Sequence, residues 1–209
     1  MNTHRPLAKY AAILPIVDQE IRTATKDIHK QIACKAGCSH CCHVLVEVVW
    51  EEALNLGVWL NRQPKSTQTR VRRKLLARYK ARKNFFESRP STKFVAKPTK
   101  SGKNLSEPTY NRFFKGNHGA CPFLHNSKCE AYEARPVSCR LHLVTSPASS
   151  CMKSAPDHAP YHLPKEIDKL RKKLTPKLQR AQTDGRWGEL SVMVTEALAV
   201  IEETDIGNM

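Results

Sequence analysis

The sequence lacks long hydrophobic runs. None of its apolar segments approaches the roughly 18 residues that a membrane-spanning helix requires, so we expect no membrane insertion. The apolar stretch from Ala11 to Val17 is short, contains Pro15 and has no small-residue cleavage site, so it does not resemble a secretory signal. These absences predict a cytoplasmic protein.

A Gly-rich phosphate-binding loop and an internal repeat are also missing. Gly116 and Gly119 have the wrong spacing for such a loop, and no strand–helix pattern follows them. With 209 residues, of which 40% are hydrophobic, the chain fits a single domain over residues 1–209. Part of the chain is expected to lie outside the main core.

Acidic residues are nearly absent from one segment. Between Arg62 and Lys103 there are 15 Lys and Arg residues against a single acid, Glu87, whereas the whole chain has a net charge of +16. The remaining 167 residues carry 20 basic and 18 acidic groups, which is close to neutral. The basic character therefore belongs to one insert.

The first part of this insert is periodic. Apolar residues recur at helical spacing from Thr67 to Phe86, and basic residues cover the other faces, which predicts an amphipathic helix. From Arg89 to Gly116 the composition changes to Pro, Ser, Thr, Lys and Gly, so we expect a long connection and place the insert at 62–116. The segment 62–103 could bind nucleic acid or another polyanion. It could equally be a solvated helix, because no base-reading motif accompanies the charge.

The rest of the chain favours helices. Apolar residues spaced by three or four predict a first helix from Leu14 to Ile32 with Pro15 in its opening turn, and another from Glu51 to Asn61. The stretch from Val44 to Trp50 could be a short strand or the lead-in to a helix. C-terminal helices are expected over 164–205: the first runs from Lys165 to Gln182 and would be kinked or split by Pro176, and the second has Trp187 on its apolar face.

The chain contains eight cysteines and no export signal, which favours metal or redox chemistry over disulfides. The first cluster has Cys34, Cys38, Cys41 and Cys42 within nine positions, and a tight loop of this kind can direct several sulfurs at one centre. Gly37 would supply backbone angles that other residues avoid. Because adjacent cysteines are difficult to direct at one tetrahedral ion, this pair suggests two neighbouring centres, or one ligand and one thiol with another role.

A second cluster follows after 78 residues without cysteine. We expect the fold to bring both clusters together around a metal site, with the basic insert looped out between them. The predicted ligands are Cys34, Cys38, Cys41, Cys42, Cys121, Cys129 and Cys139. Cys151 stands apart and receives no role.

Two arginines flank Cys139. Arg135 and Arg140 could offset thiolate charge through hydrogen bonds to sulfur, or could pair with Glu130 or Glu133 at the surface. We also place two further residues near the metal, His43 and Tyr132.

The combined motifs resemble a known family. Cys-x3-Cys-x2-Cys-Cys, then Cys-Pro-Phe-Leu, then Cys-x2-Tyr-x2-Arg-Pro-x2-Cys-Arg is similar to the YkgJ-type cysteine-cluster (CxxCxxCC) family over residues 34–143. The resemblance implies a zinc- or iron-chelating domain, and most members have no assigned activity. The basic insert and Cys151 depart from the family pattern. The family also includes a flagellin lysine N-methylase, so the resemblance leaves a metalloenzyme, such as an iron–sulfur protein-lysine methylase-like enzyme, as an alternative.

The sequence does not determine the identity of the metal. All-thiolate ligation suits zinc and iron–sulfur clusters alike, and the number of cysteines exceeds one four-ligand site. Cys34-x3-Cys38-x2-Cys41 also matches the radical S-adenosylmethionine signature, but the chain has too few strand segments for the barrel of those enzymes. We therefore predict a mainly α-helical metal-chelating protein with irregular loops around a cysteine-rich site. No catalytic constellation is identifiable, and nucleic-acid binding is the second hypothesis.

Overall fold

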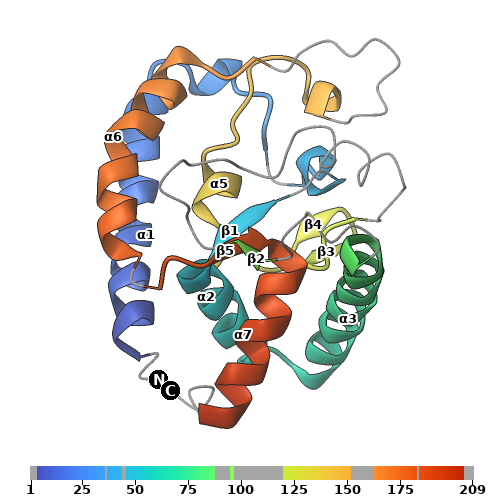
Figure 1. Ribbon diagram of the computed structural model, residues 1–209. Helices are drawn as coiled ribbons and strands as arrows, with labels where there is room; N and C mark the ends of the chain where they lie inside the picture. Colours follow the sequence, from blue (N-terminus) through green and yellow to red (C-terminus); the bar gives the residue numbers. More distant parts are fainter. Residues whose placement is uncertain are drawn as a thin grey trace.

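Helix α2 (Trp50–Asn61) lies at the centre of the molecule, and ten of its twelve residues are buried. The structure is a computed structural model that describes residues 4–35, 37–43, 46–87, 95–96, 120–151, 162–182 and 184–204. Helix α7 (Leu190–Thr204) packs along α2, and α3 (Lys65–Glu87) packs against α7 (Figure 1). Gly57 allows the close approach of α2 and α7, because a Cβ atom there would lie 2.6 Å from Cδ1 of Ile201.

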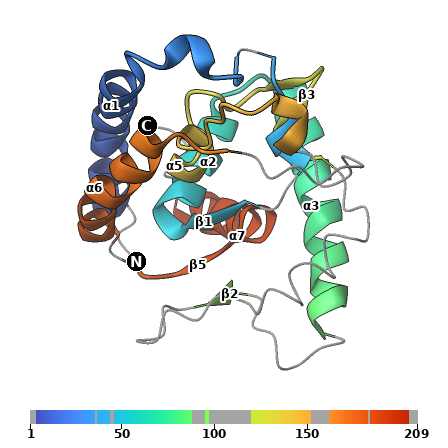
Figure 2. The same cartoon turned by 90° about the horizontal axis from the view of Figure 1, so that it is seen from above.

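A second helical layer is formed by α1 (His4–Thr25) and α6 (Lys165–Ala181), which lie side by side (Figures 1 and 2). Their apolar faces enclose a smaller core together with α5 (Val137–Arg140). Tyr10 of α1 joins the two cores, since its hydroxyl donates to the Glu52 carboxylate of α2 at 2.7 Å. The predicted mainly helical fold is confirmed.

Two short strands each lead directly into a central helix. Strand β1 (Glu47–Val49) precedes α2, and β5 (Trp187–Glu189) precedes α7; the two strands pair antiparallel. Strand β2 (Val95–Ala96) pairs with the other edge of β5. A buried glutamate accepts a backbone hydrogen bond at the start of each helix. Glu52 accepts from the N–H of Val49 at the start of α2, and Glu189 accepts from the N–H of Ser191 at the start of α7. The stretch 44–50 therefore contains both of the structures expected for it, a strand and a helix lead-in.

The predicted helix boundaries need four corrections. Helix α1 ends at Thr25 and not at Ile32, since the chain continues in turns and in a separate 3₁₀ turn at His29–Gln31. Helix α1 begins at His4, so Pro15 lies inside it on the exposed side, because Tyr10 and Leu14 already anchor the preceding turns in the core. Pro176 does not split α6, which continues to Ala181. Trp187 belongs to a strand, because β5 pairs with β1 and β2 there.

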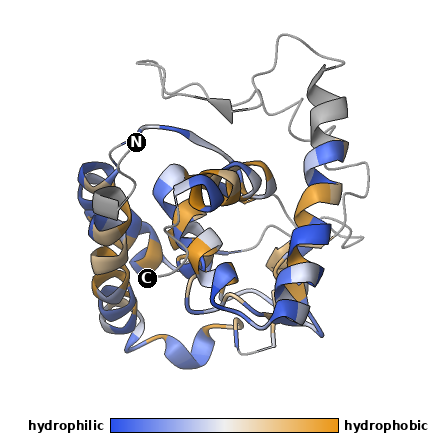
Figure 3. Cartoon of the chain, turned by 90° about the horizontal axis from the view of Figure 1, so that it is seen from below, coloured by the Kyte–Doolittle hydropathy of each residue, from blue (hydrophilic) through white to orange (hydrophobic). Residues whose placement is uncertain are grey.

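The basic insert begins with α3, as its apolar periodicity predicted. Val71 and Leu75 are buried, and hydrophobic and hydrophilic residues alternate along the helix (Figure 3). Of the connection predicted from Arg89 to Gly116, all except β2 lies outside the described residues. In the part of the chain that the structure describes, no helix is both long and apolar enough to cross a membrane.

Candidate metal centre

The first cysteine segment is a loop that ends in one turn of 3₁₀ helix. It leaves η1 (His29–Gln31), turns at Gly37, whose φ is +87°, and closes in η2 (His40–His43). A side chain at Gly37 would meet nothing within 4 Å, so glycine is needed there for its backbone angle and not for space. The loop thus carries Cys38, Cys41 and Cys42 on a few residues of chain.

The second segment is fixed to the first by its backbone. The N–H of Cys121 donates to the carbonyl of Cys42 at 2.7 Å. A hairpin of β3 (Leu124–His125) and β4 (Lys128–Cys129) then places Cys129 opposite Leu124. Its turn residues, Asn126 and Ser127, both have positive φ, as a two-residue hairpin loop requires. Helix α5 carries Cys139.

Six cysteines from both segments line one cavity of about 380 Å³. They are Cys38, Cys41, Cys42, Cys121, Cys129 and Cys139. All eight cysteines of the chain are free thiols in the structure. Apolar side chains form part of the wall, among them Leu56 and Phe123, and Lys35 and Lys128 also line it. Sequence segments separated by the basic insert thus meet at one place.

Burial dominates the electrostatics of these thiols. It raises the pKa of Cys121 to about 12, and it raises the pKa of Cys129 and that of Cys139. Cys41 and Cys42 share a hydrogen bond between their sulfurs, which lowers the pKa of Cys41 and raises that of Cys42. Most of these thiols are therefore neutral at pH 7 without metal, and a bound cation would have to displace their protons.

The donor set fits a thiophilic metal. Sulfur is the ligand that zinc, iron and iron–sulfur clusters share, and six cysteines line the cavity. Among the described side chains, no three His, Cys, Asp or Glu residues are already grouped as they would be around one ion. The sulfurs instead surround a space, and they would have to move inward to ligate.

Arg135 faces the sulfurs. It lines the cavity, and its guanidinium stacks on the Tyr132 ring at 3.9 Å from the ring centroid. Its positive charge acts to lower the pKa of three thiols, those of Cys34, Cys41 and Cys129. The buried Nε of Arg135 has no hydrogen-bond partner among the described residues. This placement is the one that charge compensation of thiolates would need.

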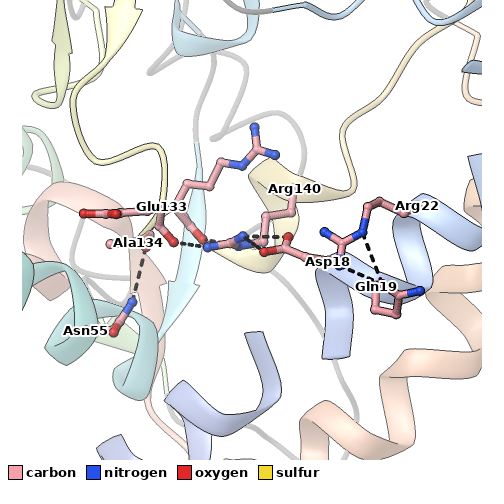
Figure 4. A network of polar contacts seen from close by, with 8 residues as sticks. Asp18, Gln19, Arg22, Asn55, Glu133, Ala134 and Arg140 are labelled. Atoms are coloured by element: carbon pink, nitrogen blue, oxygen red, sulfur yellow. Dashed lines mark hydrogen bonds and ion pairs between the residues drawn. The ribbon is translucent and has the colours of Figure 1, made fainter. Parts of the chain in front are cut away.

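Arg140 has a different environment from the one expected. Its guanidinium donates to the Asp18 carboxylate at 2.6 and 2.7 Å, to the carbonyl of Arg135 at 2.9 Å and to that of Glu133 (Figure 4). Every guanidinium nitrogen bonds to oxygen, and none of these bonds goes to sulfur or to the carboxylate of Glu130 or Glu133, the two alternatives given for Arg140. Arg140 instead joins the loop that carries Cys139 to α1.

The other two residues predicted near the metal lie at the periphery. His43 is exposed at the end of η2 and is not among the residues that line the cavity. Tyr132 lines the cavity rim with 55% of its surface exposed.

Basic residues of α3 hold the second cysteine segment, a role that the sequence reasoning missed. At every fourth position, Arg70 pairs with Glu130, Lys74 donates to the carbonyl of Leu124 at 2.7 Å, and Arg78 donates to that of Ala120 at 2.8 Å. The spacing i, i+4, i+8 places the three side chains on one face of α3. This spacing is the sequence feature that could have predicted their common contact with the second cysteine segment. This part of the insert packs against the cysteine loop and is not looped out.

Comparison with known families gives a direct result. The model of the family “CxxCxxCC: Putative zinc- or iron-chelating domain” matches residues 33–162, more than half of the chain. The chain belongs to this family. Comparison with curated proteins and with solved structures finds no significant match. The CxxCxxCC match extends beyond the predicted 34–143 and contains all eight cysteines, Cys151 included.

Proposed function

We propose that this CxxCxxCC protein holds a resident metal centre in the cysteine-lined cavity and that the metal stabilises the fold around it. The observation that carries the proposal is the convergence of six cysteines from two distant segments on one cavity. The family description, zinc or iron chelation, agrees with it.

A structural role for the metal follows from the kind of chain around the cavity. In the described parts of 34–43 and 121–139, the regular structure consists of a 3₁₀ turn, a hairpin of two-residue strands and the start of α5, so regular hydrogen bonding contributes little there. A metal ion that draws sulfurs from both segments inward would crosslink them, and its binding free energy would become folding free energy. Arg135 would offset part of the thiolate charge.

We propose zinc before iron. Four thiolates complete a tetrahedral zinc shell without another component, whereas an iron–sulfur cluster also needs sulfide. Elemental analysis and an absorption spectrum of protein purified without air test this choice. A colourless protein with stoichiometric zinc supports it, and a brown protein that contains iron and sulfide replaces zinc with a cluster. Protein without either metal contradicts the proposed function.

Nucleic-acid binding receives less support. Arg70, Lys74 and Arg78 face the cysteine loop, and Arg72 donates to Glu202 and Asn61. The exposed cations of the described part of α3 are Lys65, Arg73 and Lys80. A gel-shift titration with DNA and RNA at low salt tests this alternative. A shift that disappears with rising salt would support it.

A metalloenzyme would need an open coordination position beside the cavity. The eight thiols are enough to close every ligand position of a zinc ion, which favours a structural site over a catalytic one. Cobalt substitution tests this point, because added imidazole changes the visible spectrum of an open site and leaves that of a closed four-thiolate site unaltered.

A further inference from the structure

Two cysteines do not line the cavity. Cys34 and Cys151 are the members of the eight that do not line it. Cys151 ends η3 (Ala148–Cys151), and η3 packs against η2, as Figures 1 and 2 show for the short orange and blue turns. Cys151 is 6% exposed, so its thiol points into the protein.

Cys34 is held in place by hydrogen bonds. Its sulfur accepts a hydrogen bond from the N–H of Val144 at 3.4 Å and donates to the carbonyl of His142 at 3.6 Å. The neighbouring Ala33 N–H donates to the carbonyl of Val144 at 2.8 Å. The chain 142–144 thus fixes Cys34, and it continues directly into η3 and Cys151.

The thiols that act electrostatically on Cys151 all belong to the first cluster. After burial, the groups that raise the pKa of Cys151 are Cys34, Cys41 and Cys38. Those that raise the pKa of Cys139 include Cys121, Cys41 and Cys129. Cys41 belongs to both neighbourhoods and marks their border.

We propose that the eight cysteines form two adjacent four-thiolate metal sites. The outer site consists of Cys34, Cys38, Cys41 and Cys151, and the inner site consists of Cys42, Cys121, Cys129 and Cys139. The proposal rests on the proposed metal-binding function and adds a second centre, with Cys151 as its fourth ligand.

The two-site arrangement accounts for the adjacent pair Cys41 and Cys42. The two sulfurs lie within hydrogen-bond reach of each other, so each can serve one of two adjacent tetrahedral centres, whereas a single ion would strain both. Arg135 acts on Cys34 and Cys41 of the outer site and on Cys129 of the inner site, so one cation compensates charge in both. Four thiolates around each divalent ion leave a net negative charge that such a cation would reduce.

Metal content per chain tests the proposal. The wild-type protein and the variants Cys151→Ser, Cys129→Ser and Cys151→Ser/Cys129→Ser are purified without air, and metal is counted by native mass spectrometry and elemental analysis. Two sites predict that each single variant keeps half of the wild-type metal and that the double variant keeps none. Ser149→Ala, in the same turn as Cys151, serves as the control and should keep the full metal content.

The outcomes separate this inference from the proposed function. Full metal content in Cys151→Ser together with complete loss in Cys129→Ser would show one site and overturn the second one. A wild-type count of a single centre overturns it as well, even if the variants fail to fold. Metal-free wild-type protein would instead contradict the proposed function itself.

Discussion

The backbone N–H of Cys121 donates to the carbonyl oxygen of Cys42 at 2.7 Å, across a stretch of 78 residues that contains no cysteine. This bond fixes the relative position of the two sulfur-bearing segments before any metal is considered.

Removing the metal should abolish cooperative unfolding of the cysteine region. Dialysis against a strong chelator would take away the crosslink between segments 34–43 and 121–139, which contain little regular structure of their own. Thermal unfolding followed by circular dichroism checks this, and addition of zinc should restore the transition. An unchanged transition in protein shown to be metal-free would rule out a structural role.

Metal affinity should fall steeply as the pH is lowered. The metal binds thiolates, and burial raises the pKa of Cys34, Cys129 and Cys139 and that of Cys121 to about 12, so protons compete for these sulfurs throughout the neutral range. For each protonated thiol that ligates, affinity should change by up to about tenfold per pH unit, with tighter binding at higher pH. Competition with a zinc-binding dye between pH 6 and pH 8 measures this slope, and a flat profile would exclude thiol ligands.

Replacing Arg140 should destabilise the protein and weaken metal binding together. Arg140→Met removes the bonds to Asp18 and to two backbone carbonyls, and leaving these acceptors unpaired costs about 1–3 kcal/mol, with Asp18 still partly solvated. Urea unfolding measures the change. Arg22→Met is the matched control, because Arg22 is exposed and bonds to the Gln19 side chain (Figure 4), so its replacement should change stability by less than about 0.5 kcal/mol.

Gly57→Ala should destabilise the packing of α2 on α7, and a second substitution should reverse the effect. The new Cβ would lie 2.6 Å from Cδ1 of Ile201, and overpacking of this kind costs about 1–3 kcal/mol. Ile201→Val removes that Cδ1 atom, so Gly57→Ala/Ile201→Val should recover most of the loss. Equal instability of the double and single variants would show that space at Gly57 is not the cause.

Among the basic residues of α3, those that contact the second cysteine segment should affect metal retention, and the exposed ones should not. Arg78→Met removes the bond to the Ala120 carbonyl and a positive charge that lowers the pKa of Cys121, so metal should be lost at lower chelator concentration. Lys80→Met, an exposed site on the same helix, removes the same charge without that contact and should leave the chelator midpoint unchanged. Similar chelator midpoints for the two variants would show that the contact of Arg78 with Ala120 does not stabilise the metal site.

Several features could be predicted from spacing because they are local. The helical period from Thr67 to Phe86 is set by neighbouring residues, and the helix is present. The start of α1 was wrong because Tyr10 bonds to Glu52, a contact between distant segments that no local pattern shows. The hydrogen bond from Arg140 to Asp18, which lies on another helix, could not be predicted for the same reason.

The sequence alone determined the family, the mainly helical fold and the set of sulfurs, since these depend on residue types at short, fixed spacings. Tertiary structure decided how the sulfurs are distributed around η2 and which cations serve them. It brought Cys151 next to the first cluster and placed Arg70, Lys74 and Arg78 against the second. These arrangements depend on packing between elements far apart in the chain, where small differences in helix orientation select one partner over another.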